Sequence, residues 1–87
     1  MSRTPRDSFK DAIDGLTQAR DEARLGLHLL TLEGKQKWDE LEGKATELEM
    51  KLGEGAERAA EMHAQRAEEL TRVVHAFVDA HIRRKTH

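Results

Sequence analysis

Apolar residues recur at steps of three and four positions along most of the chain. The steps lead from Phe9 to Leu52, and after a pair of glycines they resume and continue to Phe77. This spacing is typical of amphipathic α-helices, because it places the apolar side chains on one face. The pattern therefore predicts an all-α protein built from long helices.

The first predicted helix covers about residues 5–52. Its start is marked by Thr4, whose hydroxyl can cap the helix, by Pro5 at the first helical position and by Asp7 in the first turn. The sequence has no other proline, so nothing else in this stretch is a strong helix breaker.

Three of the glycines inside this predicted helix are candidate positions for a bend: Gly15, Gly26 and Gly34. Each one disfavours a helix by about 1 kcal/mol relative to alanine. Turn-forming residues do not surround Gly15 or Gly26, so we expect a continuous helix. The position of any bend is left open among the three glycines.

A turn over residues 53–55 is expected to separate the first helix from a second one, predicted over about 56–84. Gly53 and Gly55 mark the turn, because glycine is favoured just past the C-terminus of a helix. The second helix carries apolar residues beside its core positions as well as at them. Its apolar face is therefore wider than a single partner helix would cover.

Folding the chain about Glu54 gives a long antiparallel hairpin, similar in packing to a coiled coil. Leu48 would then lie near Ala60, and Trp38 would lie near Leu70. Large residues would face small ones along this hairpin, which suits close helix packing.

In this arrangement the first helix extends beyond the second by roughly 20 residues, or about 30 Å. Phe9, Ile13 and Leu16 would have no partner within the chain. We therefore expect two copies to form a two-fold dimer with a four-helix-bundle core. The side chains predicted to form the core and the oligomer interface are Phe9, Ile13, Leu16, Leu27, Leu30, Trp38, Leu41, Leu48, Leu70, Val74 and Phe77.

A parallel two-stranded coiled coil is the rival arrangement. Lys37 and Lys44 would pair across it with Glu42 and Glu49 at the flanking heptad positions. This alternative leaves the apolar second helix uncovered, so it ranks second.

The composition limits the expected stability of the chain, its partners and its location. The 87 residues contain no cysteine, carry a net charge of −2 and include 37% charged residues. We expect a single domain, residues 1–87, that is marginal as a monomer without disulfides and is stabilised by its own second copy or another helical protein. Nucleic acid is not an expected partner because there is no excess of basic charge. A cytoplasmic location is expected, since the N-terminus lacks a secretory signal.

Residues 25–32 form the most apolar segment of the chain. Leucines at several neighbouring positions give it an unusually wide apolar arc, which indicates contact with more than one neighbour. A core between subunits is the preferred interpretation. The alternative is an amphipathic lipid or membrane-surface anchor, although such anchors usually carry basic residues on their polar face.

Histidines are the only residues whose pattern suggests metal chemistry. His63 and His81 face the predicted core, and the hairpin would bring His81 near His28. A metal-binding bundle is therefore a third hypothesis, but the spacings typical of bundle metal sites are missing, so no metal or cofactor is expected. The chain also lacks cysteine and tyrosine, and no inward carboxylate pair is present. We predict a non-catalytic structural or protein-interaction module.

Overall fold

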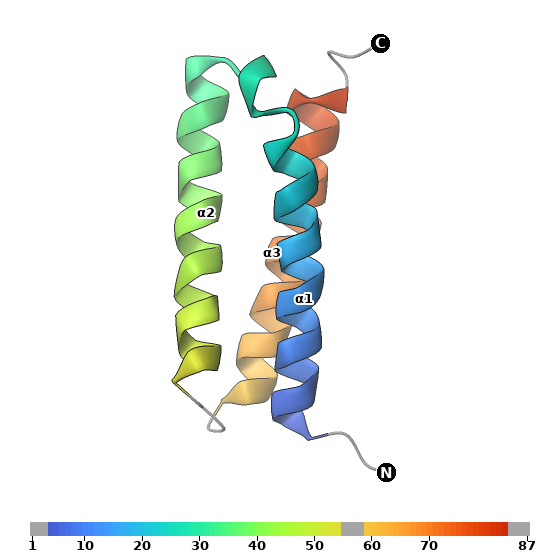
Figure 1. The fold of residues 1–87 in the computed structure, drawn as a ribbon, viewed down its shortest axis with the longest axis vertical. Coiled ribbons are helices and arrows are strands. Elements are labelled where there is room, and N and C mark those ends of the chain that lie inside the picture. Colours follow the sequence, from blue (N-terminus) through green and yellow to red (C-terminus); the bar gives the residue numbers. More distant parts are fainter. Residues whose placement is uncertain (1–3, 55–58, 84–87) are drawn as a thin grey trace.

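The chain folds into a bundle of three α-helices (Figure 1). The structure is a computed structural model, and it describes residues 4–54 and 59–83. Helix α1 spans Pro5–Arg24, α2 spans Leu32–Gly53 and α3 spans Ala60–His81, with a short 3₁₀ helix, η1, at Leu27–Leu29. These described ranges contain no β-strand.

Helix α1 begins where the sequence predicts. The backbone N–H of Asp7 donates to the Thr4 hydroxyl at 3.1 Å, and the backbone N–H of Thr4 donates to the Asp7 carboxylate at 3.2 Å. Pro5 follows as the first helical residue. This reciprocal capping box satisfies backbone donors that the helix itself leaves unpaired.

The expected continuous helix over 5–52 is wrong. Helix α1 ends at Arg24, and the chain reverses before α2 begins at Leu32. Leu30 is extended, with ψ 141°, and the Thr31 hydroxyl accepts from the backbone N–H of Gly34 at 3.1 Å. A new N-cap at Thr31 thus starts α2 with its own capping bond.

Gly26 is the glycine at which the chain departs from the helix, whereas Gly15 lies inside α1 and Gly34 lies in the first turn of α2. A Cβ atom added to Gly26 would lie 2.4 Å from Cγ2 of Ile82. Only glycine permits this close approach between the end of α1 and the end of α3.

Helices α1 and α3 run parallel and pack much more closely together than either packs against α2 (Figure 1). The contact between Gly26 and Ile82 sets their register, which brings Ala12 level with Ala67. Small side chains allow two helix backbones to approach each other closely. The buried alanines of α1 and α3 are Ala12, Ala19, Ala23, Ala60, Ala64 and Ala67.

Helix α2 runs antiparallel to both other helices (Figure 1). Trp38 packs against Phe77, with ring centroids 5.8 Å apart, and not against Leu70 as the hairpin predicts. The register between these segments is therefore shifted by one heptad. The shift follows from a longer connection, because α3 begins only at Ala60. Much of the predicted turn at 53–55 and the start of the predicted second helix lie outside the described residues.

The first helix has no uncovered overhang. Phe9, Ile13 and Leu16 are buried within the single chain. A second copy is not needed to cover them, because α2 and α3 lie beside α1 along its length. Most of the other predicted core residues are also buried in one chain, namely Leu30, Trp38, Leu41, Leu48, Leu70, Val74 and Phe77, whereas Leu27 is half-buried.

Candidate functional site: a groove between α2 and α3

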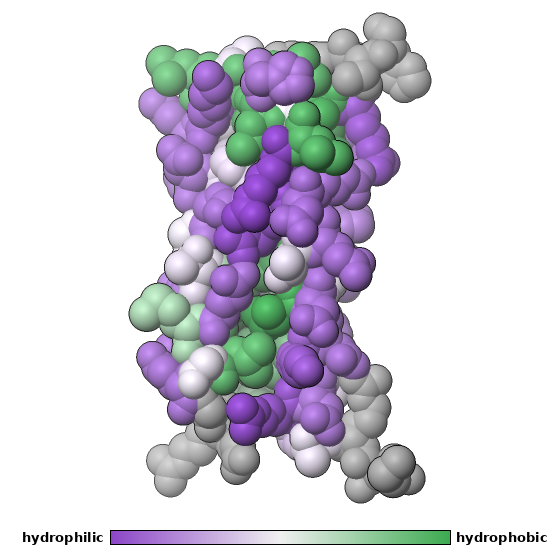
Figure 2. Space-filling model, viewed as in Figure 1, coloured by the Kyte–Doolittle hydropathy of each residue, from purple (hydrophilic) through white to green (hydrophobic). Residues whose placement is uncertain are grey.

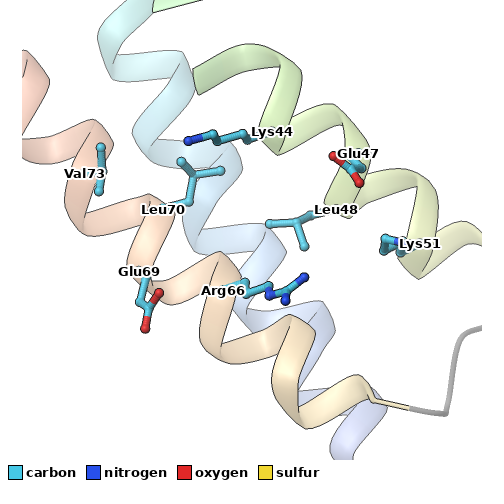
Figure 3. A pocket seen from close by; sticks show the side chains of 8 residues that line it. All are labelled: Lys44, Glu47, Leu48, Lys51, Arg66, Glu69, Leu70 and Val73. Atoms are coloured by element: carbon cyan, nitrogen blue, oxygen red, sulfur yellow. The ribbon is translucent and has the colours of Figure 1, made fainter. Parts of the chain in front are cut away.

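An open groove separates α2 from α3 on the side away from α1 (Figure 3). Leu48 of α2 and Leu70 of α3 point toward each other in it, and Val73 lies farther along α3. Val73 is apolar but 44% exposed. The groove thus has an apolar floor that solvent reaches.

Charged side chains of both signs form the rims of this groove. Helix α2 contributes Lys44, Glu47 and Lys51, and α3 contributes Arg66 and Glu69. The volume is about 330 Å³, which is at the low end for small-molecule pockets. An apolar groove of this kind instead commonly binds the apolar face of an amphipathic helix.

The eight residues that line the groove include no serine, cysteine, threonine or histidine. Its titratable groups sit on the rims, where they are open to solvent. The lining combines three apolar side chains with five charged ones, and none of its acids or bases is buried.

A buried ionic cluster holds α1 against α2. Arg20 is only 6% exposed and donates to both oxygens of Glu42, at 3.2 and 3.0 Å, and to Glu49. Arg24 also donates to Glu42, at 3.3 Å. The hydrogen bond from Arg20 lowers the pKa of the Glu42 carboxyl, and the same bond raises the pKa of Arg20.

The sequence pattern indicates Arg20 only as a polar interruption at a core position. Its partners also carry a signal, because Glu42 and Glu49 are one heptad apart and therefore lie on one face of α2. Both carboxylates bind Arg20 within one chain. The parallel coiled coil would need Glu42 and Glu49 to pair with lysines of a second chain. Because both carboxylates already bind Arg20, those pairs between chains are disfavoured.

The three candidate histidines do not converge. His63 packs against Phe9 with ring centroids 5.4 Å apart, and His81 stacks on Phe77 at 4.6 Å, whereas His28 is exposed. His63 and His81 are separated by about 27 Å of helix. Within residues 4–54 and 59–83, no group of three or more potential ligands could hold a metal ion.

The leucine-rich segment at residues 25–32 forms the corner between α1 and α2. Leu25 is 80% exposed and Leu32 is 75% exposed. Figure 2 shows apolar side chains gathered at this end of the molecule, while polar groups cover most of the same face. The sequence does not predict this exposure, because it assigns the segment to a continuous helix covered by neighbours.

Comparison with known protein families, with curated proteins and with solved structures finds no match for this chain. None of the helices in the described part of the chain is both long enough and apolar enough to cross a membrane. The groove and the exposed corner are therefore the features that indicate a function.

Proposed function

We propose that this protein is a non-catalytic interaction module that assembles with a second copy of itself through the α2/α3 face. The observation that carries the proposal is the open apolar groove with Leu48, Leu70 and Val73 along it. In a three-helix bundle this face lacks the fourth helix that would cover it. Two copies joined here would place α2 and α3 of each chain in a shared four-helix bundle.

Charge favours a second copy as the occupant. The rims carry Lys44, Lys51 and Arg66 together with Glu47 and Glu69, and the whole chain has a net charge of only −2. A surface of mixed sign can complement itself, whereas a strongly charged partner would meet repulsion at two or three of these five groups, depending on its sign. A chain of 87 residues without cysteine also gains stability by burying more surface.

Sedimentation equilibrium across a hundredfold dilution tests the proposal. The monomer mass is 9.9 kDa, and we expect twice this mass at high concentration with dissociation on dilution. Val73→Asp should shift the protein toward monomer without unfolding it, because Val73 already faces solvent. Leu25→Asp is the matched control, since it adds the same charge at an exposed apolar residue outside the groove. A wild-type monomer at every concentration would overturn the proposal.

Membrane-surface binding is the second candidate function. The exposure of Leu25 and Leu32 at one corner favours it, because those side chains need no opening of the bundle to reach a lipid surface. Flotation with vesicles of phosphatidylcholine and phosphatidylserine is the test. Wild type should float and Leu25→Asp should not, whereas wild type that stays with the soluble fraction removes this candidate.

A further inference from the structure

One face of α2 carries charges of alternating sign, three or four residues apart. Five of the six are exposed and the last is half-buried. Half of them line the groove, and the other half line a second hollow beside His81 of α3. We call this set the charge stripe: Glu33, Lys37, Glu40, Lys44, Glu47 and Lys51.

Pairing within α2 accounts for little of the charge stripe. Glutamate and lysine four residues apart often stabilise a single helix modestly. In the described residues, however, the only ion pair between members of the stripe joins Lys37 to Glu40, at 3.7 Å. The remaining charges project from the helix and can meet charges on another molecule.

The order of signs makes the charge stripe complementary to its own reverse. If a second α2 lies antiparallel across it, Glu33 faces Lys51 of the second copy, Lys37 faces Glu47, and Glu40 faces Lys44. A two-fold axis repeats each pair, which gives six pairs of opposite sign. No member of the stripe then faces a like charge.

We infer that the self-assembly proposed above is an antiparallel dimer whose two-fold axis crosses α2 midway between Glu40 and Lys44. This inference rests on the proposed function and adds its geometry. The axis lies in the plane of the interface and perpendicular to the helices. Each α2 packs on the other α2, and each α3 packs on the other α3.

Helix α3 fits the same axis. The contact of Trp38 with Phe77, together with the residues that line the groove, places the midpoint of the charge stripe level with Val73 and Ala76. The exposed Val73 would therefore lie near its own copy, where both apolar side chains lose contact with water. The most exposed apolar residue of the groove thus sits at the centre of the interface.

The other two-fold arrangement is disfavoured by charge. An axis parallel to the helices would lay α2 over α3 of the second copy at the same height. Lys51 would then face Arg66 of the second copy, and Glu47 would face Glu69, because each pair lines the same groove. Like charges in contact disfavour this dimer, whereas the charge stripes of the antiparallel dimer meet only opposite charges.

Exposed ion pairs are individually weak, so the charge stripe sets orientation and register while the apolar strip supplies much of the affinity. Dimerisation should therefore weaken when salt is raised from low to high concentration. It should not be abolished, because salt does not screen apolar contact.

Charge-changed variants give the decisive experiment. A three-lysine variant carries Glu33→Lys, Glu40→Lys and Glu47→Lys, and a three-glutamate variant carries the opposite changes at the three lysines: Lys37→Glu, Lys44→Glu and Lys51→Glu. Each should dimerise at least about tenfold more weakly than wild type. Mixed in equal amounts, the two should form a heterodimer, measured by sedimentation velocity with one variant labelled.

Two controls distinguish the effect of the order of charges in the charge stripe from the effect of net charge. Reversing all six charges restores complementarity and keeps the net charge of −2, so this variant should dimerise as wild type does. Asp14→Lys, Asp39→Lys and Glu68→Lys change the net charge as much as the three-lysine variant does, but at exposed positions off the stripe. This control should remain a dimer at physiological salt.

A cross-link tests the position of the axis independently. The chain contains no cysteine, so Val73→Cys introduces a single thiol that should form a disulfide between two copies under mild oxidation. Glu33→Cys should not, because its copy lies near the far end of α2.

The outcomes separate the inference from the proposed function. A wild-type monomer overturns both. A wild-type dimer whose three-lysine and three-glutamate variants dimerise unchanged, or whose six-charge reversal is monomeric, overturns the antiparallel axis and leaves self-assembly standing. Efficient disulfide formation by Glu33→Cys but not by Val73→Cys has the same meaning.

Discussion

The two interfaces of α3 differ in the size of the side chains that form them. Toward α1 the contact includes small residues, with Ala67 and Ala23 fully buried and Gly26 against Ile82, and the backbones approach closely. Toward α2 the contact is made by Trp38, Phe77 and other large residues, and the helices stand farther apart. Side-chain size at the contact sets the distance between helices.

This difference in helix spacing determines which pair of helices leaves apolar surface exposed. The close α1/α3 pair leaves a surface hollow without large apolar side chains, lined by Ser8, Asp11, Ala12, Gly15, Glu68 and Thr71. The wider α2/α3 pair leaves a groove that exposes Val73, because two helices held apart by large side chains do not close over their outer edge. The surface available for assembly is therefore a consequence of spacing inside the bundle.

Enlarging a residue in the close interface should give the largest effect. Ala67→Leu inserts three carbon atoms where the side chain is 0% exposed, and the helices must separate to admit them. We expect a loss of about 3 kcal/mol in the free energy of unfolding, measured by urea denaturation.

The matched control is Thr17→Leu, on the exposed side of α1. It should change the free energy of unfolding by less than about 0.5 kcal/mol. If Ala67→Leu were equally harmless, the close packing of α1 on α3 would be incorrect.

Sequence periodicity is enough to predict helical structure and most of the buried positions. Leu16, Leu41 and Val74 follow directly from it, because a helix in a small bundle buries one stripe. Thr4 also predicts the start of α1, because its capping box is formed by local residues alone. Local patterns are reliable where local interactions decide the structure.

The reversal between α1 and α2 is not decided locally. Thr31 is a good N-cap residue, but the apolar spacing continues through Leu27 and Leu30 as if the helix did. Gly26 favours the reversal because Ile82, which lies 56 residues away in the sequence, packs directly against it. The groove also depends on tertiary structure, since the register of α2 against α3 is set by a longer connection than the glycine pair indicates.

Alanine substitutions at two glycines should change the free energy of unfolding in opposite directions. Gly26→Ala would push its Cβ into Ile82, so we expect a loss of about 1–2 kcal/mol in the free energy of unfolding. Gly43→Ala adds a methyl group with no atom within 4 Å inside α2, and should gain about 0.5–1 kcal/mol. Thermal denaturation of both variants measures the difference. Equal shifts would mean that the end of α1 does not pack tightly on α3.

The smallest expected effect concerns the ionic cluster that holds α2 on α1, and it appears as a dependence on pH. Arg20 lowers the pKa of Glu42 in the folded state below its ordinary value of 4.5. The unfolded chain therefore takes up a proton at Glu42 first as the pH falls. The stabilisation from this carboxylate is complete above pH 4.5 and is lost as the pH falls toward the lower pKa of the folded state.

Glu42→Gln isolates this contribution. The difference in the free energy of unfolding between wild type and Glu42→Gln should be constant from pH 7 to about 5 and should shrink below 4.5. In an Arg20→Met background the shrinkage should be much smaller, because the guanidinium that lowers the pKa of Glu42 most is gone and only Arg24 still lowers it. Unfolding by urea between pH 7 and 3 measures both differences. A difference that stays constant through pH 3 in the Arg20 protein would show that the cluster does not hold α2 electrostatically, and the wide spacing of α2 would then follow from its large apolar side chains alone.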